Sequence, residues 1–335
     1  MVKICVFDTE TTGKPPILPG KDWKERNQND NKLLDIRDFN STSSLWKKSE
    51  IIDNWPSIIQ LGYIIYDLED TENAKIFSKY VEIPENIIIT EGSIKVHHIT
   101  RELIENQPAE KKAPIGMILA EFLNDIMDPE VTIVVGHNVQ FDRKFVIAEL
   151  LRLGRENKLT ENVNHYLEFL MDNRKFECTM NLTSTICNIQ NPVYYKDKKT
   201  GEDKMFYTIK PPKLSESYEY YFGYLPRGDE LHDALIDVVV CLRVFMKYKY
   251  KQDVCGKNVI ITEYIEKISP EGYVCPLDIT DKIETIFDLD HASQDAITII
   301  IPEKKKRGGN RSKTSKSKRG PQLRRSKRIR ALRKK

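Results

Sequence analysis

The chain has 335 residues, 40% of them hydrophobic and 9% aromatic, which is enough to bury one core of about 200 to 250 residues with some appendages. No apolar run approaches the roughly 18 residues of a membrane-spanning helix, so we expect a soluble, intracellular protein rather than a membrane protein. The net charge of +3 conceals an asymmetry, because residues 304–335 hold 17 Lys or Arg and no acid, which leaves 36 basic and 50 acidic side chains in the other 303 residues.

Three strands are predicted in the first part of the chain. Residues 2–7 (VKICVF), 58–66 (IIQLGYIIY) and 76–83 (IFSKYVEI) are short runs rich in β-branched and aromatic residues, and they favour an opening antiparallel meander. Residues 14–57, between the first two strands, are polar and lack apolar periodicity. A loop of that length in a compact domain is typically functional or mobile.

An α/β unit is predicted in the middle of the chain. Apolar residues at helical spacing indicate a helix, a strand follows at residues 131–135 (VTIVV), and a second helix runs from Gln140 to Leu153, where Gly154 is expected to end it. Strand followed by helix is typical of an α/β fold, here with a mixed central sheet flanked by helices. The apolar residues of the first helix are Ile115, Ile118, Leu119, Phe122 and Ile126.

Helices are expected again near residues 179–188, at 214–222 and from Leu231 to about Tyr250. The polar insertion at residues 190–212 is expected to be a surface excursion, and residues 251–303 give no clear assignment. Residues 304–335 lack the apolar content to fold alone, so a disordered basic tail is predicted. The cysteines include no CxxC pair, and we interpret them as small buried hydrophobic residues rather than a disulfide framework or a zinc site. They are Cys5, Cys178, Cys187, Cys241, Cys255 and Cys275.

The first candidate functional residues close the first predicted strand, in VFDTETTG (residues 6–13). Because side chains alternate along a strand, Asp8 and Glu10 point to the same face. Two carboxylates this close repel each other unless a cation or a proton lies between them. Considered alone, the pair is equally well explained as solvated acids at the end of a strand.

A third acid, Asp142, lies in GHNVQFD (residues 136–142), directly after the predicted strand at 131–135. It falls in the first turn of a predicted helix, where the helix dipole favours a carboxylate without any further role. Asn138 likewise suits a helix cap.

A histidine and a fourth acid lie in HDALIDV (residues 232–238). On one continuous helix His232 and Asp237 would be about 140° apart, so His232 must lie at or before the first turn if both are to face one site. Asp233 and Asp237, four residues apart, are an alternative acidic pair. Asp237 stands among residues that look buried, where an unpaired carboxylate is costly, so we expect a cation or a donor beside it.

The order of these motifs resembles the DEDDh 3′-to-5′ exonucleases, the superfamily of the proofreading epsilon subunit of bacterial DNA polymerase III, RNase T and the Trex enzymes. DTETTG near the start, HNVQFD in the middle and HDALID near the end carry the resemblance, and IIQLGYIIYD and VHHIT are secondary marks. Two features depart from the family pattern. His98 stands where the family has glycine, and residues 14–57 replace a much shorter connection.

The resemblance implies an RNase H-like exonuclease fold in which Asp8, Glu10, Asp142 and Asp237 hold two divalent ions, Mg²⁺ or Mn²⁺, and His232 is the general base. Hard carboxylate oxygens suit these ions, and the absence of a His/Cys cluster argues against zinc. An imidazole with an ordinary pKa near 6.5 accepts a proton from metal-bound water at neutral pH.

Substrate contacts are expected at the terminal nucleotide. Backbone groups and hydroxyls of Thr9, Thr11 and Thr12 are placed to hold a 3′-hydroxyl or a phosphate, and Phe141 to wedge or stack against a base. His97 lies in the stretch that resembles a nucleotide-contacting loop. Core packing is an equal alternative for Phe141, and a structural role is the alternative for His97.

The sequence therefore predicts a 3′-to-5′ exonuclease that releases nucleoside 5′-monophosphates, with DNA favoured as substrate. We expect an exonuclease domain at residues 1–250, an unassigned extension at 251–303 and the basic tail at 304–335. The predicted partner is nucleic acid, bound at single-stranded 3′ ends by the site and along the phosphate backbone by the tail. A second copy of the chain, a polymerase or another replication protein is a further candidate partner, and no membrane partner is expected.

Two alternatives remain open from the sequence. One is a 3′-to-5′ exoribonuclease, because such a site contacts phosphate and a terminal sugar. The other is a non-catalytic nucleic-acid-binding or packaging protein that acts through its tail. The tail also contains KKKR (304–307) and RRSKR (324–328), which are typical of nuclear import and indicate the nucleus or a site of DNA replication.

Overall fold

The computed structural model describes residues 2–15, 52, 55–156, 158, 163–197, 200–227 and 233–275. All of these belong to one compact unit, Met1–Thr280. Most of the insertion at 14–57, His232 and the basic tail lie outside the described residues. Within the described part of the chain, no helix is long and apolar enough to cross a membrane.

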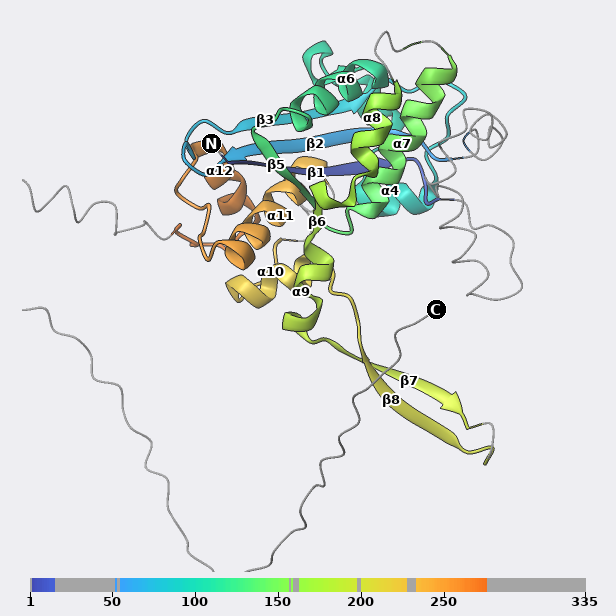
Figure 1. Cartoon of the computed structure of the whole chain (residues 1–335), viewed down its shortest axis with the longest axis vertical. Helices are drawn as coiled ribbons and strands as arrows, with labels where there is room; N and C mark the ends of the chain where they lie inside the picture. Colours follow the sequence, from blue (N-terminus) through green and yellow to red (C-terminus); the bar gives the residue numbers. More distant parts are fainter. Residues whose placement is uncertain are drawn as a thin grey trace, which may run out of the picture. The chain divides into compact units, whose positions relative to one another are not determined.

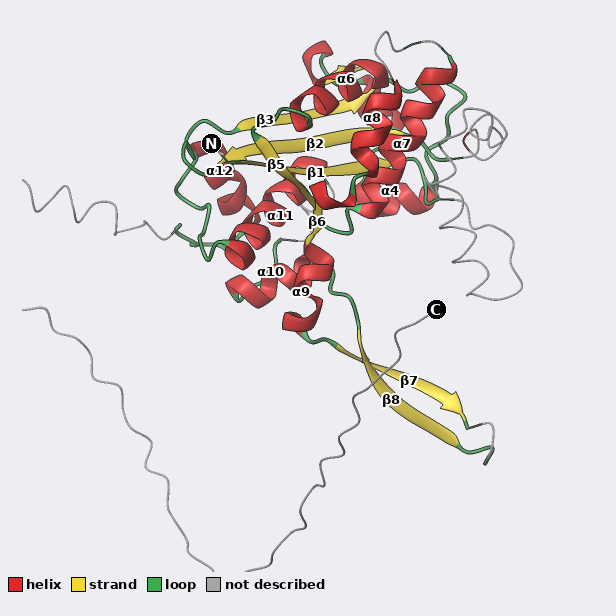
Figure 2. Ribbon diagram, in the orientation of Figure 1, coloured by secondary structure: helices red, strands yellow, loops and turns green. Residues whose placement is uncertain are grey.

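A mixed six-stranded sheet forms the centre of this unit, with strand order β4-β3-β2-β1-β5-β6 (Figures 1 and 2). The predicted antiparallel meander is confirmed, because β2 pairs antiparallel with both β1 and β3. On its other side β1 pairs parallel with β5, and β5 pairs parallel with β6. The strands are β1 (Lys3–Thr11), β2 (Ile58–Asp67), β3 (Lys75–Val81), β4 (Lys112–Ala113), β5 (Val131–Gly136) and β6 (Phe176–Cys178).

Both faces of the sheet are covered, which explains why the central strands are nearly continuous apolar runs. Along β1, Ile4 and Val6 point to one face, Cys5 and Phe7 point to the other, and all four are fully buried. Ile4 and Val6 pack against α11 (Ala234–Lys249) and α12 (Val259–Ile268). Cys5 and Phe7 pack against α6 (Ile115–Ile126), α7 (Gln140–Arg155) and α8 (Val163–Met171).

The predicted helices are present, with differences at two helix ends. α11 begins at Ala234, after the extended N-cap Asp233, so the expected start at Leu231 is wrong. α7 continues through Gly154 to Arg155, so the expected stop at Gly154 is wrong. A side chain at Gly154 would place its Cβ 3.2 Å from Val163, so the glycine allows α8 to approach closely. The remaining helices are α4 (Glu91–His97), α5 (Arg101–Glu105), α9 (Thr179–Cys187) and α10 (Leu214–Phe222), with 3-10 turns at Ala109–Lys111 and Asn173–Lys175.

Residues 190–212, which the sequence marked only as a surface excursion, contain an antiparallel hairpin. β7 (Gln190–Lys196) and β8 (Asp203–Ile209) form a two-stranded sheet of their own between α9 and α10. A hairpin was not recognised in the sequence because its strands lack a buried face, so no alternation of apolar and polar residues marks them.

The core continues past residue 250, into the stretch that the sequence left unassigned. Ile261 and Ile265 of α12 are fully buried against α11. Cys255 and Cys275 form a disulfide with their Cα atoms 5.8 Å apart, so the interpretation of these two cysteines as isolated hydrophobic residues is wrong. Their separation of 20 residues concealed the pairing in the sequence. Cys5, Cys178 and Cys241 are buried free thiols, as expected, and Cys187 is half-buried.

Candidate active site

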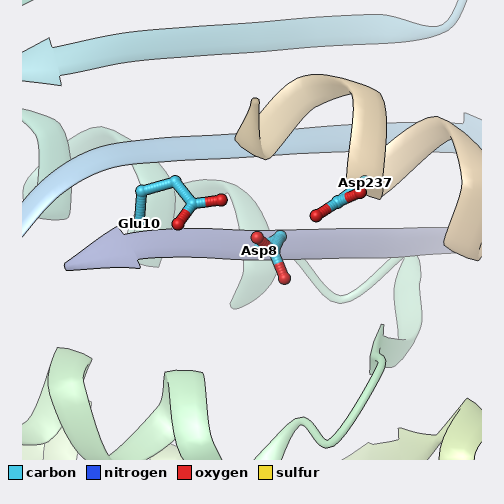
Figure 3. A group of neighbouring side chains, drawn as sticks. All are labelled: Asp8, Glu10 and Asp237. Carbon is cyan, nitrogen blue, oxygen red and sulfur yellow. The ribbon is translucent and has the colours of Figure 1, made fainter. Parts of the chain in front are cut away.

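Three of the predicted acids meet on one face of the sheet. Asp8 and Glu10 continue the face of β1 that Ile4 and Val6 begin, and α11 covers that face. Asp237 lies in the first turn of α11, and Figure 3 shows its carboxyl pointing toward Asp8 on β1. One carboxylate oxygen from each of Asp8, Glu10 and Asp237 lies within 4.8 Å of the other two.

The electrostatics of this cluster oppose ionisation of its members. Burial raises the pKa of Asp8 well above its ordinary value, and the nearby charges of Asp142, Asp237, Glu10 and Asp233 raise it further. Burial is also the main cause that raises the pKa of Glu10 to about 9, followed by the charges of Asp237, Asp142 and Asp233.

These carboxylates have the properties of a divalent-cation site. Among the described residues, no Lys or Arg forms an ion pair with Asp8 or Glu10, and every neighbouring charge that shifts their pKa is acidic. A group of buried hard oxygen donors that repel one another could hold a divalent cation. The identity of the ions as Mg²⁺ or Mn²⁺ stays a prediction.

Asp142 approaches β1 from the other face of the sheet. It is buried in the first turn of α7, and its Oδ1 accepts hydrogen bonds from the amide (3.1 Å) and the hydroxyl (2.8 Å) of Thr9. Thr9 lies beyond Val6, the last residue of β1 that pairs with β5, so Asp142 provides the partner that a neighbouring strand would otherwise supply. Burial raises the pKa of Asp142 to about 7, although the Thr9 hydrogen bonds lower it.

Asp142 therefore lies outside the group of three mutually close carboxylates. It is still an electrostatic neighbour of that group, because its charge raises the pKa of Asp8 more than any other charge does. The structure thus brings all four predicted acids to one region, with three in direct proximity and the fourth held by Thr9.

A buried glutamine fixes the beginning of α11 to β2. Gln60 donates from Nε2 to Oδ2 of Asp233 at 2.9 Å and accepts at Oε1 from the amide of Ala234 at 3.2 Å. Oδ1 of Asp233 accepts from the amide of Leu235 at 3.0 Å, so Asp233 is the N-cap of α11. The role of Gln60 was missed in the sequence, where the only signal is a lone amide inside the apolar run IIQLG.

A glycine on the same strand allows the helix to approach. A Cβ at Gly62 would lie 2.9 Å from the backbone of Ala234 and of Leu235, which is too close for any side chain. Gln60 and Gly62 thus set the position of the first turn of α11, from which Asp237 extends. Asp233, which the sequence offered as an alternative partner of Asp237, has its carboxylate engaged in the cap.

The predicted general base, His232, lies outside the described residues. In the sequence it directly precedes Asp233, the N-cap of α11, and its role as general base stays a prediction.

His137 has a structural role. Its Nε2 lies 3.1 Å from the carbonyl of Pro212, and its Nδ1 lies 2.9 Å from the hydroxyl of Thr179. Since the carbonyl can only accept, Nε2 carries the proton and Nδ1 accepts from Thr179. Burial lowers the pKa of His137 to about 4, so the ring is neutral at physiological pH.

The predicted substrate-binding threonines are buried and already hydrogen-bonded. Thr9 donates its hydroxyl to Asp142, Thr11 donates to the carbonyl of Gly13 at 2.9 Å, and the hydroxyl of Thr12 accepts from the amide of Ser57 at 2.9 Å. These bonds shape the turn after β1. A contact of the three threonines with substrate stays a prediction.

His97 joins α4 to the end of β1. Its Nδ1 accepts from the amide of Ile99 at 3.0 Å, so Nε2 donates to the carbonyl of Thr11 at 3.1 Å. His98 has a left-handed backbone with φ of 58°, which explains why glycine suits this position in the family that the motif resembles. Phe141 is partly buried and packs on Phe145, with 4.8 Å between ring centroids. Direct roles for His97 and Phe141 in binding substrate stay predictions.

Comparison with known proteins identifies a sequence family. Residues 5–189, more than half of the chain, match the RNase T family model, which is described as an exonuclease. The match includes β1 from Cys5 onward and the first turn of α7, and it ends before α11, so Asp8, Glu10 and Asp142 lie within it and Asp237 does not. No match was found among curated protein sequences.

Two solved structures are given as examples of those to which the chain is similar. Escherichia coli exonuclease I, in complex with a dA16 oligonucleotide, has 12% identity and a TM-score of 0.43 over 79% of this chain and 43% of that one. Exonuclease I from Methylocaldum szegediense has 13% identity and a TM-score of 0.43 over 75% of this chain and 42% of that one. The chain thus spans less than half the length of either structure.

Proposed function

The chain belongs to the exonuclease family, and from this premise we propose that it is a metal-dependent 3′-to-5′ exonuclease that releases nucleoside 5′-monophosphates. The observation that carries the proposal is the convergence of Asp8 and Glu10 from β1 with Asp237 from α11, beside Asp142. In the described part of the chain, the charges that shift the pKa of Asp8 and Glu10 are all acidic, and buried carboxylates gathered in this way fit a site built for cations.

The protein's own residues hold and orient the reacting groups in this proposal. Asp8, Glu10 and Asp237 hold the divalent ions, and Asp142 adds negative charge beside Asp8 while it fixes the backbone at Thr9. When bound, such ions would supply stabilisation of the negative charge on the attacking and departing oxygens of the phosphodiester. Gln60 keeps α11, and with it Asp237, in place.

We propose His232 as the general base. The Gln60–Asp233 contact fixes the chain at the residue that directly follows it. An imidazole accepts a proton from the attacking water at neutral pH, because its ordinary pKa is near 6.5. We do not propose His137 for this role, because both of its ring nitrogens are hydrogen-bonded within the protein.

The test uses single-stranded DNA, duplex DNA and RNA of one sequence, each labelled at the 3′ end or at the 5′ end, with Mg²⁺. A 3′-to-5′ exonuclease releases the 3′ label at once as a mononucleotide and converts the 5′-labelled strand into a ladder. EDTA should stop the reaction. A 5′ label released first as a mononucleotide would contradict the proposed direction.

Substitutions test the role proposed for each residue of the site. Asp8→Ala and Asp237→Ala should abolish cleavage without loss of the folded state, and His232→Ala should lower the rate severely while cation binding is retained. The matched control is Asp70→Ala, which removes an exposed acid whose carboxylate accepts hydrogen bonds from Asn73. Cleavage by Asp8→Ala at the wild-type rate would remove this cluster from the mechanism.

We propose DNA rather than RNA as the preferred substrate, with RNA as the rival. The ratio of kcat/KM values on the matched DNA and RNA strands decides between them. The basic tail is proposed as a phosphate tether, so a chain that ends at residue 303 should keep the EDTA-sensitive activity and bind long strands more weakly. Loss of all activity in that chain would instead favour a protein that works through its tail.

A further inference from the structure

The β7–β8 hairpin, residues 190–209, exposes an unusual set of apolar side chains. It forms a two-stranded sheet separate from the central sheet, and Figure 1 shows it extending from the ends of α9 and α10. Soluble proteins rarely gather large exposed apolar side chains without a binding role, and an isolated two-stranded hairpin is only marginally stable in water. The exposed fractions are 74% for Tyr194, 45% for Tyr195, 46% for Met205, 48% for Phe206, 60% for Tyr207 and 47% for Ile209.

The strand register divides these side chains between two faces. Tyr194 pairs with Met205, Pro192 with Tyr207 and Gln190 with Ile209, so all of them share one face. Tyr195 and Phe206 lie on the other face, where their rings contact each other with centroids 5.7 Å apart. We call the face with Tyr194 and Tyr207 the open face, because its two rings form no ring contact with other described residues.

The hairpin carries a small positive charge on an acidic protein. Residues 190–209 contain four Lys and three acids, whereas the body of the chain, residues 1–303, has 14 more acids than bases. Lys204 forms an ion pair with Asp197 at the end of the hairpin. Lysine is depleted in protein–protein interfaces, whereas lysines interleaved with aromatic rings are typical of surfaces that bind single-stranded nucleic acid.

The base of the hairpin is attached beside the active site. The amide of Lys210 donates to the carbonyl of Ile189 at 2.8 Å, and His137 donates to the carbonyl of Pro212 at 3.1 Å. His137 directly follows β5, which runs parallel to β1. The carboxyl ends of parallel strands lie at the same edge of a sheet, so the hairpin begins at the edge where Asp8 and Glu10 lie.

We propose that the β7–β8 hairpin binds single-stranded nucleic acid, with bases stacked on Tyr194 and Tyr207 of the open face and phosphates near its lysines. This rests on the proposed function, because the bound segment is the part of the substrate strand upstream of the 3′ end. A hairpin in this place holds the strand while its end is removed. Short strands do not reach the hairpin, so only longer substrates benefit from it.

The first test measures binding without cleavage. Affinity for a fluorescent single-stranded oligonucleotide of about 20 nucleotides is measured in EDTA by anisotropy. Tyr194→Ala combined with Tyr207→Ala should weaken binding about tenfold or more, because each stacked base contributes measurably to affinity. Tyr194→Phe combined with Tyr207→Phe keeps both rings and should bind like the wild type. Tyr220→Ala, which removes a tyrosine that is 53% exposed on α10, is the matched control and should also bind normally.

A second variant lacks the hairpin altogether. It keeps the test valid if the alanine substitutions disturb the local fold. Asn-Gly replaces residues 190–209, because Ile189 and Lys210 are already joined by a backbone hydrogen bond that a two-residue turn can close. Equal thermal unfolding of this variant and the wild type would show that the body is intact. It should bind the long strand at least as weakly as the alanine variant.

Cleavage kinetics, measured beside affinity, distinguish a failure of the hairpin proposal from a failure of the proposed exonuclease function. With Mg²⁺, the KM for a strand of about 20 nucleotides should rise in the shortened variant, and kcat/KM for a strand of about three nucleotides should stay unchanged. Because affinity is measured in EDTA, the hairpin is tested even if the chain proves to cleave nothing. Unchanged affinity in the shortened variant overturns the proposal. A wild-type dimer that becomes monomeric on shortening, with nucleic-acid affinity unchanged, overturns it in favour of a second copy of the chain on the open face.

Discussion

Alternation along a single strand distributes the acids of the site between two helices. Asp8 and Glu10 point to the face covered by α11 and so meet Asp237, whereas Thr9 points to the opposite face and holds Asp142 of α7. A shift of one residue in the register of β1 would turn Asp8 and Glu10 to the opposite face and Thr9 to the face covered by α11. The chemistry of the site therefore depends on the pairing of β1 with β2, from Lys3 to Thr11.

Glu10→Gln is expected to stabilise the metal-free protein and to abolish cleavage. The pKa of Glu10 in the folded protein, about 9, is above its ordinary value of 4.5, so stability is lost as the pH rises between these values. Glutamine does not ionise, so at pH 8 in EDTA the variant should be more stable than the wild type by at least about 1 kcal/mol. Thermal unfolding at pH 4 and pH 8 measures this. A stability difference that does not grow with pH would contradict the assignment of Glu10.

His137→Gln tests a residue whose pKa is lowered by burial, whereas the pKa of Glu10 is raised. The pKa of His137 in the folded protein, about 4, is below the ordinary value of 6.5, so its contribution to stability is present above pH 6.5 and is lost as the pH falls toward 4. Glutamine can still donate to the carbonyl of Pro212 but does not titrate. The variant should therefore lose less stability than the wild type between pH 7 and pH 4, as measured by urea unfolding. Parallel stability curves for the two proteins would count against a buried neutral His137.

At the scale of elements, the position of α11 against β2 decides whether the site assembles. Gln60 fixes the N-terminus of this helix, and Gly62 leaves room for its backbone. Neither role can be recognised in the sequence, because each depends on a contact with residues far along the chain. The helix itself could be predicted, since its apolar periodicity is local.

Gly62→Ala is expected to displace α11. The added methyl group would overlap backbone atoms of Ala234 and Leu235, which cannot move aside by side-chain rotation. We expect a loss of about 1 to 3 kcal/mol in unfolding free energy and a fall in kcat of about 100-fold, because small misplacements of catalytic groups are costly. Gly92→Ala, at a helical glycine with no atom within 4 Å of the added Cβ, is the matched control and should not reduce either quantity. Wild-type kcat in Gly62→Ala would show that the close approach is not needed.

At the scale of the whole molecule, the distribution of charge along the chain indicates which segments can attract nucleic acid. The acidic body repels nucleic acid, so basic segments are needed to attract it, and the tail at residues 304–335 and the β7–β8 hairpin are the two candidates. α12 instead belongs to the body, because its Ile261 and Ile265 are fully buried against α11.

Two shortened chains separate these contributions. A chain that ends at residue 303 should unfold at the same temperature as the wild type, with a weaker salt dependence of nucleic-acid binding, because fewer counterions are released. A chain that ends at residue 250 lacks α12 and should lose several kcal/mol of unfolding free energy, because two buried isoleucines are removed. Thermal unfolding and binding at two salt concentrations measure both effects. Equal stability of the two shortened chains would show that α12 is dispensable.

The residue types and order of DTETTG, HNVQFD and HDALID already indicated an exonuclease-like site, because cation binding and proton transfer require particular side chains that are visible in a sequence. Local periodicity likewise predicted the meander and the main helices. Contacts between distant residues could be seen only in the folded chain. They are the approach of the three carboxylates, the hydrogen bonds from Thr9 to Asp142, the contact of Gln60 with Asp233 and the Cys255–Cys275 disulfide. The exposed hairpin was likewise visible only in the structure. The physical reason is that register and packing bring residues together independently of their separation along the chain.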